Sequence, residues 1–257
     1  MLVCPVRGCG ASLEREERRV MCANRHSFDI ARSGYINLLQ PQERRSRLPG
    51  DTPEAIDARR RLHDRGVTAP LADAITALSA ATGDDVVLDA GCGEGFYLGT
   101  LAQRAGCEAH GIDISTGAVD RAARRYPHCT WVVGNADRLI PYADASFSLV
   151  LSITARRNGP EFRRVLRNGG RLLVAVPAPQ DLIELRGVGR DRVEQTVESL
   201  AADFTLVEQR RASTTADLDA DAVQDVLHSI YRPLRAQPVD AMRVTFSLDL
   251  LLFSKSL

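Results

Sequence analysis

The chain has 257 residues, of which 44% are hydrophobic and 26% are charged, and these proportions are ordinary for a soluble globular protein. This length accommodates one large domain and one small domain. No apolar run approaches the roughly 20 residues that span a bilayer, and the first ten residues lack a signal-peptide core, so we expect a cytoplasmic protein with no membrane anchor.

The N-terminal quarter is basic, although the formal net charge of the whole chain is zero. Residues 1–65 contain 13 Arg against 9 Asp and Glu, a net charge of +4. Residues 66–257 contain 20 Lys and Arg against 24 Asp and Glu, a net charge of −4. This asymmetry favours an anionic partner at the N-terminal part. A solvated arginine-rich surface is the alternative.

The first 26 residues contain three cysteines and one histidine with the spacing of a zinc site. Four residues separate Cys4 from Cys9, and three separate Cys22 from His26. Three thiolates and one imidazole make a closed tetrahedral site of the structural type. Metal binding would supply free energy that so short a segment cannot obtain from a hydrophobic core. We predict a zinc-binding module over residues 1–35; the alternative is a chance grouping of these side chains.

Residues 36–70 are predicted to form an arginine-rich connector. Pro49-Gly50 is a turn signal, after which Asp51 or Thr52 can cap a helix that begins at Pro53. The arginines fall into two groups, which either bind phosphates or are solvated. These groups are Arg44, Arg45 and Arg47 before the turn and Arg59, Arg60 and Arg61 on the helix.

From residue 71 onward, helical and strand patterns alternate. Strand patterns fall at 86–90, 109–114, 130–133, 147–153, 172–176, 204–209 and 244–253, and helical patterns at 71–81, 97–105, 118–125, 160–166 and 221–231. This alternation predicts an α/β fold with a doubly wound parallel sheet over residues 71–257. A long insertion separates the last two strands, which favours an antiparallel closing strand. The single cysteines of this part, Cys92, Cys107 and Cys129, are expected to be small core residues.

The first of these strands ends in a glycine-rich loop. Glycines occupy alternate positions at Gly91, Gly93 and Gly95, directly after Asp89. The dinucleotide fingerprint requires a third glycine where this chain has Phe96, so NAD is disfavoured. The spacing instead resembles the first motif of class I S-adenosylmethionine-dependent methyltransferases, and we therefore expect a Rossmann-like methyltransferase domain.

Three acidic residues follow three successive strands, at the edge of the sheet where α/β proteins bind ligands. Asp89 opens the glycine loop, Asp113 is placed to accept hydrogen bonds from a ribose, and Asp137 to accept from an adenine amino group. Three turn aspartates in an unrelated α/β protein are the alternative. The sequence predicts an S-adenosylmethionine site formed by Asp89, Gly91, Gly93, Gly95, Asp113 and Asp137.

Taken together, the two halves of the chain resemble the bacterial 23S rRNA (guanine-N1) methyltransferases, which include housekeeping and macrolide-resistance branches. The cysteine and histidine set carries the resemblance, as do several segments distributed along the chain. These are Phe28-Asp29-x-Ala31-Arg32-x-Gly34-Tyr35-x-Asn37-Leu38-Leu39, Pro49-Gly50-Asp51, Ala58-Arg59-Arg60, Asp89-x-Gly91-Cys92-Gly93-Glu94-Gly95, Arg125-Tyr126-Pro127 and Gly169-Gly170.

The resemblance implies methyl transfer to N1 of a guanine in a hairpin loop of 23S rRNA, whose bases can be splayed out for recognition. It implies that the zinc module grips the RNA, and it makes macrolide resistance and a homodimer further expectations. Guanine N1 carries a proton that must leave, and Glu161 and His228 are candidate bases by position alone. Arg156 and Asn158 are candidates for steadying guanine O6 as negative charge moves there.

Three segments depart from the family pattern. Residues 152–159 replace a stretch that faces the acceptor base in relatives, residues 66–68 replace Gly-His-Tyr, and residues 227–231 replace a Thr-Pro or Gly-Pro stretch. Two other functions therefore stay open: a methyltransferase acting on a small natural product, and a non-catalytic RNA-binding relative. The zinc module with its arginines argues against the first, and the intact acids argue against the second.

Overall fold

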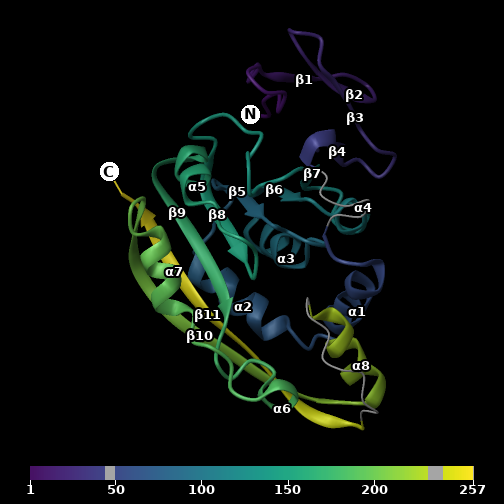
Figure 1. Ribbon diagram of the computed structural model, residues 1–257, viewed down its shortest axis with the longest axis vertical. Coiled ribbons are helices and arrows are strands. Elements are labelled where there is room, and N and C mark those ends of the chain that lie inside the picture. Colours follow the sequence, from purple (N-terminus) through teal and green to yellow (C-terminus); the bar gives the residue numbers. More distant parts are fainter. Residues whose placement is uncertain (44–49, 231–239, 257) are drawn as a thin grey trace.

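The computed structural model describes residues 1–43, 50–230 and 240–256 (Figure 1). Within that part, a small antiparallel sheet lies near the N-terminus and an eight-stranded sheet forms the centre of the molecule. The small sheet consists of β1 (Leu13–Arg15), β2 (Arg19–Cys22) and β3 (Ser27–Asp29). An isolated bridge between Leu2 and Tyr142 joins this N-terminal module to the large domain.

The large sheet has the strand order β10-β11-β9-β8-β5-β6-β7-β4. Its neighbouring strands are parallel, except that β11 runs antiparallel to both β9 and β10. The chain winds in opposite directions from β5 and β8, and open α/β sheets bind ligands at such a switch point. The strands are β4 (Ile36–Asn37), β5 (Val86–Ala90), β6 (Glu108–Asp113), β7 (Thr130–Val133), β8 (Phe147–Ile153), β9 (Leu166–Pro177), β10 (Phe204–Leu218) and β11 (Met242–Lys255).

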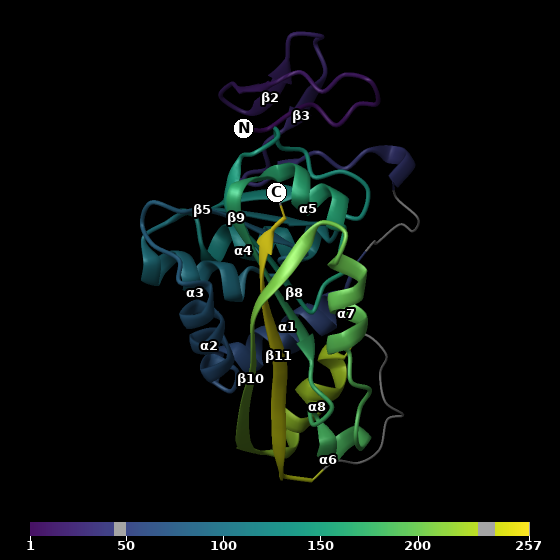
Figure 2. The ribbon, with the colours of Figure 1, turned by 90° about the vertical axis from the view of Figure 1, so that its left-hand side faces the viewer.

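Helices cover both faces of this sheet, with α2 and α3 on one side and α5 and α7 on the other (Figure 2). Successive residues of β5 therefore enter different cores: Val87 packs with the first group of helices and Leu88 with the second. Because both faces are buried, the central strands are continuous apolar runs. The helices are α1 (Pro53–Asp64), α2 (Ala69–Ser79), α3 (Phe96–Ala105), α4 (Thr116–Arg125), α5 (Gly159–Val165), α6 (Ile183–Arg186), α7 (Val193–Leu200) and α8 (Ala220–Ser229), with a 3-10 turn at Pro41–Glu43.

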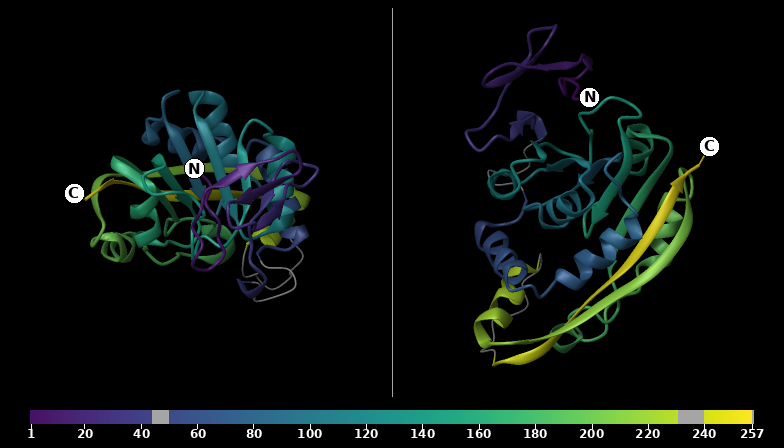
Figure 3. Two further views of the ribbon diagram at one scale, coloured as in Figure 1. Left: turned by 90° about the horizontal axis from the view of Figure 1, so that it is seen from above. Right: turned by 180° about the vertical axis from the view of Figure 1, so that it is seen from behind.

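This architecture confirms the predicted α/β fold and the antiparallel closing strand. The last strands are longer than predicted: β10 and β11 pair over their whole length and form a curved edge of the molecule (Figure 3). Gly169 lies within β9 with a left-handed φ of 71°. None of the helices that the structure describes combines the length and hydrophobicity needed to cross a membrane.

The predicted connector takes part in the large domain. Its residues Ile36 and Asn37 form β4, which pairs in parallel with β7. The helix α1 begins as predicted, and the hydroxyl of Thr52 accepts a hydrogen bond from the backbone N–H of Ala55 at 3.2 Å. Arg44, Arg45, Arg47 and Pro49 lie outside the described residues. The boundary after residue 35 stays a prediction, with the strand that follows it belonging to the central sheet.

The three single cysteines are only partly as expected. Cys92 and Cys129 are buried core residues, as predicted. Cys107 is only half-buried, because it precedes the first residue of β6 at the rim of the sheet, so its prediction as an ordinary core residue was wrong.

Candidate functional site

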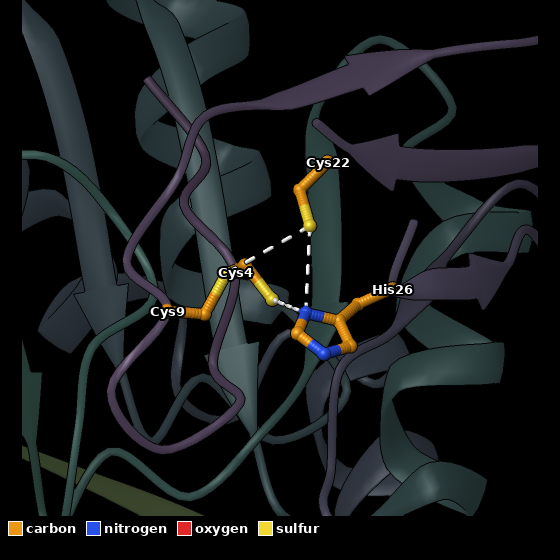
Figure 4. A group of neighbouring side chains, drawn as sticks. All are labelled: Cys4, Cys9, Cys22 and His26. Carbon is orange, nitrogen blue, oxygen red and sulfur yellow. Dashed lines mark hydrogen bonds between the residues drawn. The ribbon is translucent and has the colours of Figure 1, made fainter. Parts of the chain in front are cut away.

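Cys4, Cys9, Cys22 and His26 converge in the N-terminal module, as the sequence predicted (Figure 4). Their ligand atoms all lie within 4.8 Å of one another, with 3.8 Å between the sulfurs of Cys9 and Cys22. A zinc tetrahedron with Zn–S distances of about 2.3 Å has sulfur–sulfur edges of about 3.8 Å. The donor set and its spacing therefore fit a structural Zn²⁺ ion.

Tight turns bring these four side chains together. Arg25 has a left-handed φ of 62°, and its N–H donates to the carbonyl of Cys22 at 2.8 Å, which folds His26 back onto Cys22. Burial raises the pKa of the Cys4 thiol to about 12, whereas a hydrogen bond from the backbone of Ala11 and another from Asn24 lower the pKa of Cys9 to about 6. A bound divalent cation favours the thiolate form of such residues.

The glycine loop between β5 and α3 has the geometry of a ligand cradle. Gly91, Gly93 and Gly95 all have positive φ, at 89°, 54° and 81°. A Cβ at Gly91 would lie 2.4 Å from the Cβ of Ala155, and a Cβ at Gly95 would lie 2.4 Å from the ring of Trp131. A Cβ at Gly93 would meet only the guanidinium of Arg59, at 3.7 Å. Gly91 and Gly95 are thus fixed by packing, and Gly93 leaves room for a ligand.

Asp89 and Asp113 lie at this loop. Both carboxylate oxygens of Asp113 accept backbone hydrogen bonds, from the N–H of Gly93 at 2.9 Å and from that of Ser115 at 2.8 Å. Asp89 is buried, and its Oδ1 has no hydrogen-bond partner among the described residues. Burial, with the nearby charges of Asp113 and Glu94, raises the pKa of Asp89 to about 8. A buried carboxylate oxygen without a donor, beneath a glycine cradle, fits a cationic ligand such as S-adenosylmethionine.

Asp137 is set apart from these two acids. It is exposed, follows β7, and contacts the guanidinium of Arg156 at 3.4 Å. The side-chain amide of Asn158 donates to the carbonyls of Ala136 and Asp137, both at 3.1 Å. Arg156 and Asn158 therefore connect the loop after β8 to the loop that carries Asp137.

Sequence reasoning did not identify Glu94 and His63 as part of the site. Glu94 is buried within the glycine loop, with its Oε1 3.0 Å from Nε2 of His63 and its Oε2 3.7 Å from the guanidinium of Arg59. Burial opposes ionisation of Glu94, but the close contact with the His63 imidazole and the charge of Arg59 lower its pKa. The imidazole of His63 stacks on Phe96 at 3.8 Å. The available signal was the four-residue spacing of Arg59 and His63, which places both on one face of α1.

The arginines of α1 are ion-paired within the protein, which removes the support for phosphate binding by this group. Arg59 donates to Asp51 at 2.7 Å, Arg60 lies 3.7 Å from Asp64, and Arg61 donates to Asp225 of α8 at 2.9 Å. α1 and α8 consequently lie side by side (Figure 1).

The predicted acceptor segment, residues 152–159, comprises the end of β8 and the loop after it, and this loop contributes to a recess of about 430 Å³. Thr154 has a left-handed φ of 51°, a conformation held by its N–H donating to Ala175 at 2.9 Å. This bend brings Ala155 against Gly91. The recess is lined by Ala155, Arg156, Arg157, Gly159, Ser199 and Leu200. Arg157 has no ion-pair partner in the described part of the chain, so one unpaired and one weakly paired arginine line this recess.

The two candidate bases have different surroundings. Glu161 accepts a hydrogen bond from the N–H of Ile140 at 2.7 Å and one from Arg164 at 2.8 Å, so its carboxylate is already occupied. His228 is exposed near the end of α8 and contacts Gln224 at 3.0 Å. The structure therefore favours neither of them by contact with the recess.

Comparisons with known proteins match both halves of the chain. The family model described as "RlmA, N-terminal" matches residues 2–47, and the model described as "Methyltransferase domain" matches residues 87–174. A 23S rRNA (guanine(748)-N(1))-methyltransferase of Streptomyces fradiae is 38% identical over 88% of this chain and 83% of its own length. A Micromonospora griseorubida protein, provisionally named a 23S rRNA (guanine-N(1)-)-methyltransferase, is 36% identical over 79% of this chain and 74% of its own length.

Solved structures share the fold of the large domain. The crystal structure of the [4+2]-cyclase SpnF matches with a TM-score of 0.52 and 19% identity, over 73% of this chain and 81% of that chain. Likeness at such low identity shows the fold alone. Because a cyclase shares this fold, the reaction must be argued from the site and from the closer relatives.

Proposed function

Because this chain belongs to the family of 23S rRNA (guanine-N1) methyltransferases, we propose that it transfers a methyl group from S-adenosylmethionine to N1 of a guanine in a hairpin loop of 23S rRNA. The observation that carries the proposal is the combination, in one chain, of the three-cysteine, one-histidine cluster with the glycine cradle and its buried acids. A methyltransferase acting on a small natural product would require only the second of these.

On the cofactor side, each of the three acidic residues has its own proposed contact. Asp113 accepts hydrogen bonds from the ribose hydroxyls, Asp137 accepts one from the adenine amino group, and Asp89 compensates the positive charge of the ligand. S-adenosylmethionine supplies a methyl group already activated by its sulfonium. The protein then contributes alignment of the acceptor, for which about 7–11 kcal/mol is an upper bound. The contact between Ala155 and Gly91 places the acceptor loop directly against the cradle.

On the acceptor side, Arg156 and Asn158 have different proposed roles. The exposed guanidinium of Arg156 is free to stabilise guanine O6, where negative charge accumulates as N1 loses its proton. Both hydrogen bonds of the Asn158 side-chain nitrogen go to the loop that carries Asp137, so Asn158 acts on the base only through its oxygen and otherwise positions that loop.

The N-terminal module makes the proposed contacts with the RNA. Several of its arginines are exposed and make no ion pair within the described chain, which suits contacts with phosphates. These are Arg7, Arg15, Arg18, Arg25 and Arg32. Because the arginines of α1 already have acidic partners, their ion pairs support assigning this role to the module and not to the helix.

Residues 1–35 act as the RNA-recognition module, 36–70 as the connector and 71–257 as the methyltransferase domain. The enzyme works in the cytoplasm, where its rRNA substrate is made. That the enzyme forms a homodimer is expected from the family resemblance alone. Methylation of the hairpin loop would confer macrolide resistance.

The test is transfer of labelled methyl from S-adenosylmethionine to unmodified 23S rRNA, followed by primer extension. A methyl on guanine N1 blocks Watson–Crick pairing, so we expect one reverse-transcriptase stop within a hairpin loop. Binding of S-adenosylmethionine without methylation of any RNA would contradict the proposal and favour a small-molecule acceptor. Failure to bind S-adenosylmethionine would instead favour a non-catalytic RNA-binding protein.

A further inference from the structure

The guanidinium of Arg59 faces the open position of the cofactor cradle. A Cβ built on Gly93 would approach no described atom other than Arg59 Nη1, at 3.7 Å. The side chain of Arg59 is 28% exposed, and it comes from α1, which lies outside the segment 87–174 matched by the methyltransferase model. The cradle is therefore completed by a residue that the connector contributes.

Only part of the hydrogen-bonding capacity of Arg59 is used within the protein. Its Nη2 donates to Asp51 at 2.7 Å and to the carbonyl of Ser229 at 3.3 Å. Its Nη1 lies 3.7 Å from Glu94, which is beyond hydrogen-bond distance, and donates to no other group in the described chain. Arginine has five N–H donors in a rigid plane, so the N–H groups that point at Gly93 are the ones left without an acceptor.

The surroundings of Arg59 are otherwise acidic. Asp51, Glu94 and Asp113 all lie near its guanidinium, and Asp89 is buried beneath the same loop. Such a site attracts the ammonium and sulfonium of S-adenosylmethionine but repels the carboxylate of its methionine part. Since that carboxylate must be desolvated in the cradle, it needs a cation close to Gly93.

We propose that Arg59 binds the carboxylate of the methionine part of S-adenosylmethionine through Nη1, and that Glu94 and His63 are positioning residues that hold the guanidinium at Gly93. The proposal rests on the cofactor part of the proposed function and makes no assumption about the RNA. In this arrangement, the buried contact with His63 holds the carboxylate of Glu94 in the place where Arg59 faces it. An arginine that merely fastens α1 to the loop is the competing explanation.

The two explanations are separated by changing the ligand. Binding of S-adenosylmethionine and of its decarboxylated analogue is measured by calorimetry for the wild type, Arg59→Gln, Arg59→Lys and the control Arg61→Gln. Arg61 lies on the same helix but pairs with Asp225. We expect the wild type and Arg61→Gln to prefer S-adenosylmethionine by about 10- to 100-fold, the size of a hydrogen-bonded charge contact.

Arg59→Gln should remove that preference while binding the decarboxylated analogue about as well as the wild type, and Arg59→Lys should keep part of it. Equal loss of both ligands in folded Arg59 variants would show a purely structural role and overturn the inference. A wild type that does not distinguish the two ligands would overturn it even if Arg59→Gln fails to fold. Failure of the wild type to bind S-adenosylmethionine at all would instead overturn the proposed function.

Discussion

The proposed cofactor side and the proposed acceptor side of the catalytic centre are built in different ways. On the cofactor side, Gly91 packs against Ala155 and Asp113 accepts two backbone hydrogen bonds. On the acceptor side, Arg156 is 76% exposed with one contact at 3.4 Å. Under the proposed function, the fold preforms the cofactor site, whereas the acceptor site is completed by groups of the RNA. Substitutions on the cofactor side should therefore weaken binding of S-adenosylmethionine, whereas substitutions on the acceptor side should slow methyl transfer to RNA.

The largest effect is expected from Gly91→Ala on the cofactor side. The new methyl group would lie 2.4 Å from Ala155 in a backbone with φ 89°, so both the loop and the acceptor bend must shift. The backbone conformation alone costs about 1–3 kcal/mol. We expect no measurable binding of S-adenosylmethionine by calorimetry and a melting temperature lower by about 2–10 °C.

Gly169→Ala is the matched control for that prediction. Gly169 has a similar φ of 71°, but a Cβ there would meet no atom within 4 Å. This variant should show the loss of stability without the loss of cofactor binding. If both variants bound S-adenosylmethionine normally, the cofactor loop would be more adaptable than its packing indicates.

Asp113→Ala should lower the affinity for S-adenosylmethionine by roughly 100-fold or more, because it removes the ribose acceptor and leaves two backbone N–H groups unpaired. Asp137→Ala should lower it by less than about tenfold, because Asp137 is exposed and competes with water. Equilibrium binding measures both. Equal losses of affinity in the two variants would contradict the contrast between the preformed contact at Asp113 and the open one at Asp137. Unchanged affinity in Asp113→Ala would contradict the assignment of Asp113 to the ribose.

The buried carboxyl of Asp89 predicts a pH dependence on the cofactor side. Burial raises its pKa to about 8, so below that pH the group must lose a proton before it can compensate a cationic ligand. Affinity for S-adenosylmethionine should rise about tenfold per pH unit as the pH approaches 8, and then level off. Binding measured between pH 6 and 9 tests this, and Asp89→Asn should abolish the slope.

Stability of the protein without ligand should show the opposite trend. The folded state binds the proton of Asp89 more tightly than the unfolded state, in which the pKa of this group is about 4. Protonated Asp89 therefore contributes fully to the free energy of unfolding below pH 4, and this contribution is lost as the pH rises to about 8. Chemical denaturation across this range, compared with Asp89→Asn, measures it. A slope that is the same in the variant would assign the effect to another group.

The same contrast explains which features the sequence could predict. The zinc cluster, the glycine loop and the order of strands along the chain depend on local spacing and on hydrophobic period, so each of them is evident from the residues alone. The pairing of β4 with β7 depends on only two residues, too few for a pattern. The contact of His63 with Glu94 joins positions 31 residues apart in a packing arrangement that no periodicity encodes.

Arginines were predictable as a set but not individually. The three consecutive arginines of α1 suggest a basic surface, yet Arg61 is paired with Asp225, 164 residues further along the chain. No sequence pattern indicates that partner, because the fold alone brings α8 beside α1. The unpaired, exposed arginines of the N-terminal module, by contrast, have no partner within the described chain, so the anionic partner that the charge asymmetry indicated stays a prediction for them.

An effect confined to the acceptor side is expected from Arg156→Ala, which should lower kcat/KM for RNA by about tenfold and leave the affinity for S-adenosylmethionine unchanged. The reason is that the Arg156 guanidinium has one weak contact in the protein, so its contribution appears only when the guanine is present. Asn158→Ala should additionally weaken cofactor binding, because its amide holds the loop of Asp137. Arg104→Ala, which removes a surface arginine paired with Asp73 on α2, controls for the loss of positive charge alone. Weaker cofactor binding in Arg156→Ala would show that Arg156 instead orients Asp137, and the two sides would then share one network of contacts.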